Sequence, residues 1–226
     1  MTEHPDQPWS RSAPAGAARE LLLRGVFGPL IAGYATVQVS GRPGLDAIPG
    51  PVVLVANHSS HVDTPVLLRA LPAARRRRTL VAAAADYWYA SRALATAVSL
   101  AFGTVPLPRR REGETTSALA PLQELIAAGW SLVIFGEGTR SRSGRLGPFR
   151  SGAAALSRSA GVPLVPVHLD GTARLMPPGR AWMTRPGDGR RRHSVTVSFG
   201  APLPPTPEGA LTDTMNEVRR FMTARA

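Results

Sequence analysis

Two short runs of apolar residues place the strongest limit on the fold of this chain. Residues 51–56 read PVVLVA and residues 131–135 read SLVIF. Unbroken apolar runs of this length are typical of strands that are buried on both faces, as in parallel sheets. Each run is followed by a loop and then by a segment with helical character, and this alternation predicts repeated strand–helix units.

The same alternation extends through most of the sequence. We expect strands over residues 35–40, 51–56, 80–84, 104–107, 131–135, 164–169 and 194–199. We expect helices over residues 17–30, 64–71, 87–100, 117–128 and 152–160, a closing helix with Leu211, Met215, Val218 and Met222 on one face, and a turn over 41–44. The 226 residues suit one α/β domain with a mostly parallel central sheet flanked by helices. In such folds ligands bind outside the carboxyl ends of the strands.

The first part of the chain looks different from the rest. Residues 1–16 are polar and contain prolines, so we expect a disordered start followed by one domain over residues 17–226. No basic stretch leads into an apolar one, so no signal peptide is expected. The uncharged segments 25–41 and 93–108 are short and interrupted for membrane-spanning helices. Each of them could be a core segment or could lie on a bilayer.

The charge of the chain limits its partners. All 27 basic residues are arginines, against 15 acidic residues, and the formal net charge is +12. Such a surface attracts polyanions, including nucleic acid, anionic lipid headgroups and acidic carrier proteins. The arginines at 75–78, at 142, 145 and 150, and at 190–192 are either solvated faces or contacts to an anionic leaflet. The absence of cysteine excludes disulfides, thiolate metal sites and a cysteine nucleophile.

The loop after the first apolar run carries a histidine and a carboxylate. His58 and Asp63 are five residues apart in the sequence NHSSHVD, between a predicted strand and a predicted helix. Asp63 can therefore turn back and hydrogen-bond one imidazole nitrogen, while the other nitrogen removes a proton from a substrate hydroxyl. Asp63 is also a good helix N-cap, which is the structural alternative.

A metal site is a second alternative for this loop. His58, His61 and Asp63 resemble half of a metallohydrolase cluster. The binuclear pattern His-x-His-x-Asp-His is absent, and only His168 and His193 follow downstream. We therefore expect no metal here.

A glycine-rich loop follows the second apolar run. Residues 135–141 read FGEGTRS. Glycines permit close backbone approach, and Thr139, Arg140 and Ser141 offer hydroxyls and a guanidinium fork that suit a phosphate. The loop does not match the phosphate-binding loop of nucleotide-binding proteins, and by itself it could be a simple turn.

Together these segments resemble a known family, the glycerolipid acyltransferases of the 1-acylglycerol-3-phosphate type. NHSSHVD resembles the family's NH-x4-D block, and FGEGTRS resembles its F-P-E-G-T-R-S block. VPLVPVHLDGT at 162–172 resembles the V-P-[IV]-[VI]-P-V block, and GTVPLPR at 103–109 resembles the G-x5-R block. The match runs in order from about residue 41 to residue 202. Gly136 stands where the family has proline, and Pro108 stands where an aspartate commonly precedes the arginine.

The resemblance implies an α/β acyltransferase fold and an O-acyltransferase activity. It implies that His58 deprotonates the acceptor hydroxyl for attack on an acyl thioester, with Asp63 supporting His58. The residues implied to bind the acceptor and its phosphate are Arg109, Glu137, Gly138, Thr139 and Arg140. Val165 and Pro166 are implied to shape the acyl-donor side, and no cofactor or metal is required.

The resemblance also implies the partners. The donor is acyl-CoA or acyl-carrier protein, and the expected acceptor is the lysophospholipid 1-acylglycerol-3-phosphate, with other polar lipids such as a lyso-ornithine lipid or a glycolipid as alternatives. We expect a peripheral protein on an anionic membrane, on its cytoplasmic side, in phospholipid biosynthesis. A basic nucleic-acid-binding or lipid-binding protein without catalysis is the rival, but it explains the charge and none of the ordered blocks. Because aromatic residues do not alternate with the basic runs, no nucleic acid is expected.

Overall fold

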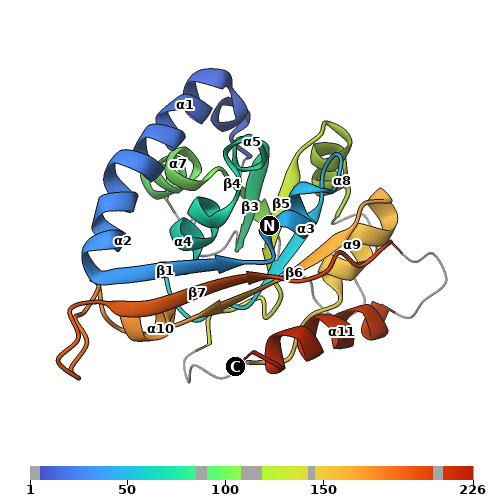
Figure 1. Cartoon of the computed structure of the whole chain (residues 1–226). Coiled ribbons are helices and arrows are strands. Elements are labelled where there is room, and N and C mark those ends of the chain that lie inside the picture. The colour runs from blue at the N-terminus through green and yellow to red at the C-terminus, as the bar shows by residue number, and fades with distance from the viewer. Residues whose placement is uncertain (1–5, 85–90, 108–118, 142–145, 206–210, 226) are drawn as a thin grey trace.

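The computed structural model describes residues 6–84, 91–107, 119–141, 146–205 and 211–225. These residues form one α/β domain around a seven-stranded sheet in the order β1-β7-β6-β2-β5-β3-β4 (Figure 1). The strands are β1 (Ala35–Ser40), β2 (Val53–Ala56), β3 (Thr79–Ala84), β4 (Thr104–Leu107), β5 (Ser131–Phe135), β6 (Leu164–Asp170) and β7 (His193–Phe199). Neighbouring strands are parallel except for β6 and β7. The predicted fold class is confirmed.

Helices connect most of the strands. They are η1 (Pro8–Arg11), α1 (Ala13–Leu22), η2 (Leu23–Phe27), α2 (Gly28–Tyr34), α3 (Arg42–Asp46), α4 (Asp63–Ala70), α5 (Ala73–Arg76), α7 (Arg92–Phe102), α8 (Ala120–Ala127), α9 (Gly152–Ala160), α10 (Thr172–Leu175) and α11 (Leu211–Thr223). The turn η2 is π-helical and joins α1 and α2 into one helical run.

The two faces of the sheet carry different helices. Leu54 and Ala56 of β2 belong to the core beneath η2, α2, α3 and α4, whereas Val53 and Val55 belong to the core beneath α8, α9 and α11. All four side chains are fully buried. Because successive side chains of a strand point to opposite faces, the unbroken apolar run of β2 is what allows helices to pack on both sides.

The start of the chain corrects two expectations. We expected disorder through residue 16, but η1 begins at Pro8 and α1 begins at Ala13. The hydroxyl of Ser12 caps α1 by accepting a hydrogen bond from the amide of Ala15, and a serine cap of this kind is a signal for the start of a helix. The expected turn over residues 41–44 is instead the beginning of the short helix α3, entered through Gly41 at φ +75°.

Both uncharged segments of the sequence contribute to the core and to the surface. The first buries Ile31 and exposes Val26, and the second buries Val98 and exposes Leu94. Part of each segment therefore belongs to the core, and the alternative that the segments lie on a bilayer stays a prediction. Among the residues that the structure describes, no helix combines the length and the apolar character needed to span a bilayer.

The sheet brings the loops of interest to one edge. Strand β2 lies between β5 and β6, with Ala56 opposite Phe135 on one side and Val167 on the other. Because the three strands are parallel, the loops that follow them begin side by side at their carboxyl ends. This edge holds the site described next.

Candidate active site

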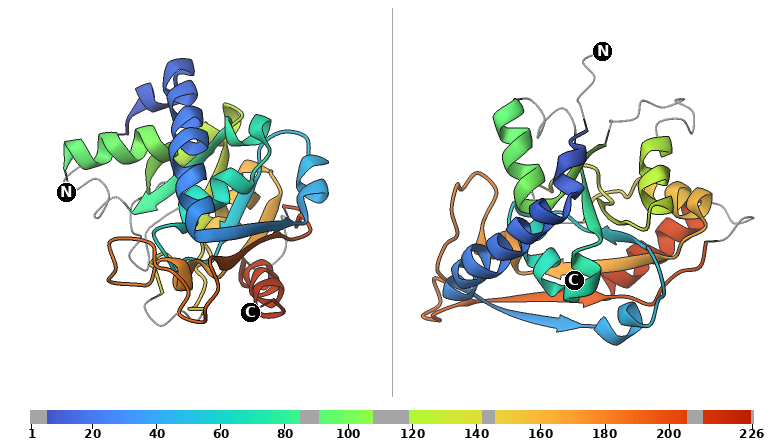
Figure 2. Two further views of the ribbon diagram at one scale, coloured as in Figure 1. Left: turned by 60° about the vertical axis from the view of Figure 1, so that its left-hand side comes forward. Right: turned by 90° about the horizontal axis from the view of Figure 1, so that it is seen from above.

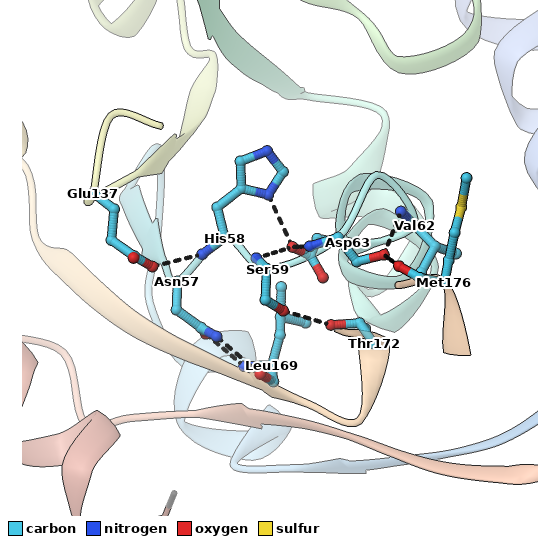
Figure 3. A network of polar contacts seen from close by, with 10 residues as sticks. Asn57, His58, Ser59, Val62, Asp63, Glu137, Leu169, Thr172 and Met176 are labelled. Atoms are coloured by element: carbon cyan, nitrogen blue, oxygen red, sulfur yellow. Dashed lines mark hydrogen bonds and ion pairs between the residues drawn. The ribbon is translucent and has the colours of Figure 1, made fainter. Parts of the chain in front are cut away.

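The loop between β2 and α4 is organised around the carboxylate of Asp63. One carboxylate oxygen, Oδ2, accepts hydrogen bonds from the amides of Ser59 at 2.7 Å and Ser60 at 2.8 Å. The same oxygen lies 2.8 Å from Nδ1 of His58 (Figure 3). Asp63 is completely buried, so the carboxylate keeps one orientation beneath the imidazole. The structure thus brings together the two residues that the sequence placed five positions apart.

This contact defines the chemical state of the imidazole. An ionised carboxylate can only accept a hydrogen bond, so the proton of a neutral His58 ring lies on Nδ1 and the lone pair lies on Nε2. Figure 3 shows Nε2 on the side of the ring away from Asp63. The His58 side chain retains 17% exposure, and its ring stacks on Phe135 with centroids 4.0 Å apart. Stacking and hydrogen bonding together limit rotation of the ring.

The carboxylate of Glu137 connects this loop with the loop that follows β5. Its Oε1 accepts a hydrogen bond from the backbone amide of His58 at 3.0 Å, and its Oε2 accepts one from the amide of Gly147 at 3.0 Å. Glu137 is buried, with 9% exposure. We expected Glu137 to bind the acceptor, but in the structure both of its oxygens already bond to backbone groups of the protein.

The other side of the loop is tied to β6 and to α10. The side chain of Asn57 donates to the carbonyl of Leu169 at 2.9 Å and accepts from the amide of Leu169 at 2.8 Å. The hydroxyl groups of Ser59 and Thr172 lie 3.1 Å apart, and both residues are buried (Figure 3). These bonds give the VPLVPVHLDGT block a role in holding the histidine loop.

A second tie to this side comes from Ser60. Its hydroxyl donates to the carbonyl of Met176 at 2.8 Å, just beyond α10. The loop is therefore bonded to the chain on both of its flanks.

The remaining residues of the FGEGTRS block lie next to His58. Gly138 adopts φ +70°, and a side chain at this position would meet the guanidinium group of Arg150. The amide of Ser141 donates to the carbonyl of His58 at 2.8 Å. Thr139 is exposed, and Arg140 is partly buried with its Nε unpartnered among the described residues.

His61 lies within the electrostatic reach of Arg140. Burial, and then the positive charges of Arg140 and His58, lower the pKa of His61, and the carboxylate of Asp63 opposes this shift. His61 is therefore neutral over a wider pH range than a free histidine.

The other residues that were named from the sequence lie in several different places. Gly136 is hydrogen-bonded through both backbone groups, since its amide donates to Ala56 and its carbonyl accepts from Arg150. Val165 and Pro166 are buried in β6. Arg109 lies outside the described residues.

Several residues of this network were not predicted to belong to it, among them Asn57, Thr172 and Gly147. Asn57 and Thr172 stand in blocks that the sequence analysis singled out, so proximity to those blocks is a signal that could have pointed to them. Gly147 carries no such signal, because only the folded loop brings its amide to Glu137.

Comparison with known proteins shows which family this chain belongs to. A model of the family described as Acyltransferase matches residues 37–170. The chain is 34% identical over 164 residues to a Brassica napus protein named 1-acyl-sn-glycerol-3-phosphate acyltransferase BAT2, chloroplastic, a match that covers 70% of this chain and 44% of the relative. It is 32% identical over 118 residues to the human 1-acyl-sn-glycerol-3-phosphate acyltransferase alpha, covering 52% of this chain and 40% of the relative. The chain thus spans less than half the length of either relative.

A solved structure supports the fold. The crystal structure of the 1-acyl-sn-glycerophosphate (LPA) acyltransferase PlsC from Thermotoga maritima aligns with a TM-score of 0.63 and 21% sequence identity. The alignment covers 93% of this chain and 76% of that chain.

Proposed function

Because this chain belongs to the Acyltransferase family, we propose that it transfers a fatty acyl group from a thioester donor to the hydroxyl of a lysophospholipid. The names of the plant and human relatives support 1-acylglycerol-3-phosphate as the acceptor and phospholipid biosynthesis as the role. The observation that carries the proposal is the pair of His58 and Asp63, which leaves Nε2 of the imidazole as a base at the edge of the sheet.

In this mechanism the protein acts as a base and forms no covalent intermediate. Nε2 of His58 takes the proton of the acceptor hydroxyl as the hydroxyl oxygen forms a bond to the thioester carbonyl carbon. Asp63 stabilises the resulting imidazolium through its bond to Nδ1. The carbon–sulfur bond then breaks, and the thiolate leaves with the proton returned from Nε2. One ester and one thiol are formed for each thioester consumed.

The acceptor phosphate has suitable partners beside the histidine. We assign it to Gly138, Thr139, Arg140 and Arg109, the last of which lies outside the described residues. A guanidinium group binds phosphate oxygens through paired hydrogen bonds, and Arg140 is only partly buried.

The donor and the location complete the proposal. The acyl group comes from acyl-CoA or acyl-carrier protein, and the reaction requires no cofactor. The protein works as a peripheral protein on the cytoplasmic side of an anionic membrane, an assignment supported by its net charge of +12.

Thioester consumption tests this proposal directly. Purified protein is mixed with oleoyl-CoA and a panel of lysophospholipids and other polar lipids, and free thiol is followed over time. We expect thiol release to require 1-acylglycerol-3-phosphate and to fall about 100-fold or more in His58→Ala, because general-base catalysis typically contributes that much. Thermal unfolding of His58→Ala controls for folding.

Two results would overturn the assignment. Thiol release that is unchanged in His58→Ala would remove the histidine from the mechanism. A complete lack of release, with acyl-carrier protein as well as with CoA, would reject acyl transfer.

A further inference from the structure

One exposed segment between α10 and β7 is not used by the proposed chemistry. Residues 177–192, here called the arginine loop, contain five arginines and a single acidic residue, Asp188. They also contain Trp182, which is 55% exposed, whereas Trp9 is 44% exposed. In Figures 1 and 2 the loop projects beyond the sheet, next to the end of α2. Its composition differs from that of an ordinary solvent loop because a large aromatic side chain stands among cations.

The arginine loop is held in a defined position. The amide of Thr184 donates to the carbonyl of Leu175 at 2.8 Å. The guanidinium group of Arg185 donates to the carbonyl of Gly33 at 3.0 Å and lies 4.9 Å from the ring centroid of Tyr34. The loop is therefore fastened both to α10 and to the end of the N-terminal helical run.

Trp182 is oriented by the same region. Its indole N–H donates to the hydroxyl of Tyr34 at 3.4 Å, while the residue as a whole stays exposed. A tryptophan with its polar group bonded and its ring exposed gains free energy when the ring enters a membrane interface.

Few acidic residues balance the positive charges of the arginines in this loop. Arg190 pairs with Asp188 at 3.5 Å. Arg180, Arg191 and Arg192 are exposed and form no ion pair with any acidic residue that the structure describes. Their charges are available to an anionic partner.

The arginine loop is connected to the catalytic edge of the sheet. It begins immediately after Met176, whose carbonyl accepts the hydrogen bond from Ser60 in the histidine loop. It also follows α10, where Thr172 contacts Ser59. The arginine loop therefore leaves the fold next to the residues that hold the histidine loop.

We propose that Trp182 and the exposed arginines of this loop dock the protein on an anionic lipid bilayer and thereby present the catalytic edge to its lipid acceptor. This inference rests on the proposed acyl transfer to a lipid. Exposed Leu21 and Val26 lie on the helical run that the loop contacts at Gly33, roughly 10 to 20 Å away at the helical rise. Exposed arginines beside an exposed tryptophan and exposed aliphatic side chains suit an anionic bilayer, whose interface binds cations and also accepts aromatic and apolar side chains.

Binding to vesicles tests the docking surface. Sedimentation is measured with phosphatidylcholine vesicles that contain or lack phosphatidylglycerol. The triple variant Arg180→Gln, Arg191→Gln, Arg192→Gln is expected to partition roughly 100-fold less to the anionic vesicles, at about five-fold for each arginine. Trp182→Ala is expected to weaken binding to both kinds of vesicle.

A second triple variant provides the matched control. It carries three substitutions at exposed positions outside the arginine loop, Arg77→Gln, Arg158→Gln and Arg220→Gln, and so removes the same amount of charge. We expect this variant to weaken binding to the anionic vesicles much less. Equal weakening by both triple variants, or unchanged binding of the loop variants, would overturn the docking surface. Loss of turnover with acyl-carrier protein but not with CoA, at unchanged vesicle binding, would assign the loop to the acidic carrier instead.

The readouts separate this inference from the proposed function. Acyl transfer to a short-chain acceptor dispersed without vesicles is expected to be unchanged in the loop variants. Loop-dependent vesicle binding without any acyl transfer would reject the proposed function and leave the docking surface in place.

Discussion

At the residue scale, Glu137 shows how a side chain can support a site by bonding to the backbone. Its carboxylate accepts hydrogen bonds from the amides of His58 and Gly147. Replacement by glutamine keeps the size of the side chain, but it places an NH2 group, which is a donor, opposite one of these two amide donors. We therefore expect Glu137→Gln to lower kcat roughly 10- to 100-fold, which corresponds to the cost of one lost charge-assisted hydrogen bond. The acceptor KM should change little, because the side chain positions His58.

Steady-state kinetics distinguishes this role from direct binding of the acceptor. A raised acceptor KM at an unchanged kcat would show that Glu137 binds the acceptor, as the family resemblance implies. Glu124→Gln, an exposed change on α8, is the control and should behave like the unaltered protein.

At the scale of elements, the junction between β6 and α10 depends on a glycine. Gly171 adopts φ +83°, and a methyl group there would collide with the carbonyl oxygen of Ser194 in β7. Gly179 has nearly the same conformation, φ +82°, but has open space around it. Both alanine substitutions incur the cost of a left-handed backbone, about 1 to 2 kcal/mol. We expect Gly171→Ala to lower the free energy of unfolding by at least about 1 kcal/mol more than Gly179→Ala, because the backbone must also move.

Urea unfolding of the two variants measures this difference. Gly171→Ala should also reduce acyl transfer, since its neighbour Thr172 contacts Ser59 in the histidine loop. Equal stability of the two variants would mean that the junction adjusts without strain.

At the scale of the whole molecule, buried and half-buried arginines attach the N-terminal helical run to the domain. Arg76 donates to both carboxylate oxygens of Glu20, at 2.9 and 2.5 Å. Arg69 donates to the carbonyl of Leu23 at 2.7 Å, and the guanidinium group of Arg19 donates to the carbonyl of Ser99 at 2.9 Å. These bonds make the helical run an integral part of the domain.

The Glu20 pair makes stability depend on pH in a defined direction. The hydrogen bond from Arg76 lowers the pKa of Glu20, although burial opposes the shift. A lowered pKa in the folded state means that the stabilisation is present above the ordinary pKa, about 4.3, and is lost as the pH falls through the folded value. We expect Glu20→Gln to lower the free energy of unfolding by about 1 to 3 kcal/mol at neutral pH.

Urea unfolding at neutral and at acidic pH checks this expectation. The difference between Glu20→Gln and the unaltered protein should shrink as the pH falls below the ordinary pKa of glutamate. A difference that is the same at both pH values would contradict it. Glu217→Gln, an exposed change on α11, should leave stability nearly unchanged at both.

Local features of this protein could be predicted well from the chain alone. The apolar runs of β2 and β5 identify buried strands because a strand that is buried on both faces is apolar at nearly every position. His58 and Asp63 are close in sequence, so one short loop suffices to bring them together. The start of α1 and the helix α3 were missed, because short caps and single turns give weak signals in the sequence.

Contacts between distant segments required the folded structure. Glu137 and Leu169 reach the histidine loop because β2 lies between β5 and β6, and that order arises only when the whole chain packs around the sheet. The position of Trp182 against Tyr34 likewise joins residues 148 positions apart. The spacing of residues in the sequence predicts contacts within a short segment, such as the contact between His58 and Asp63. The pairing of remote segments depends on the free energy of packing the whole chain.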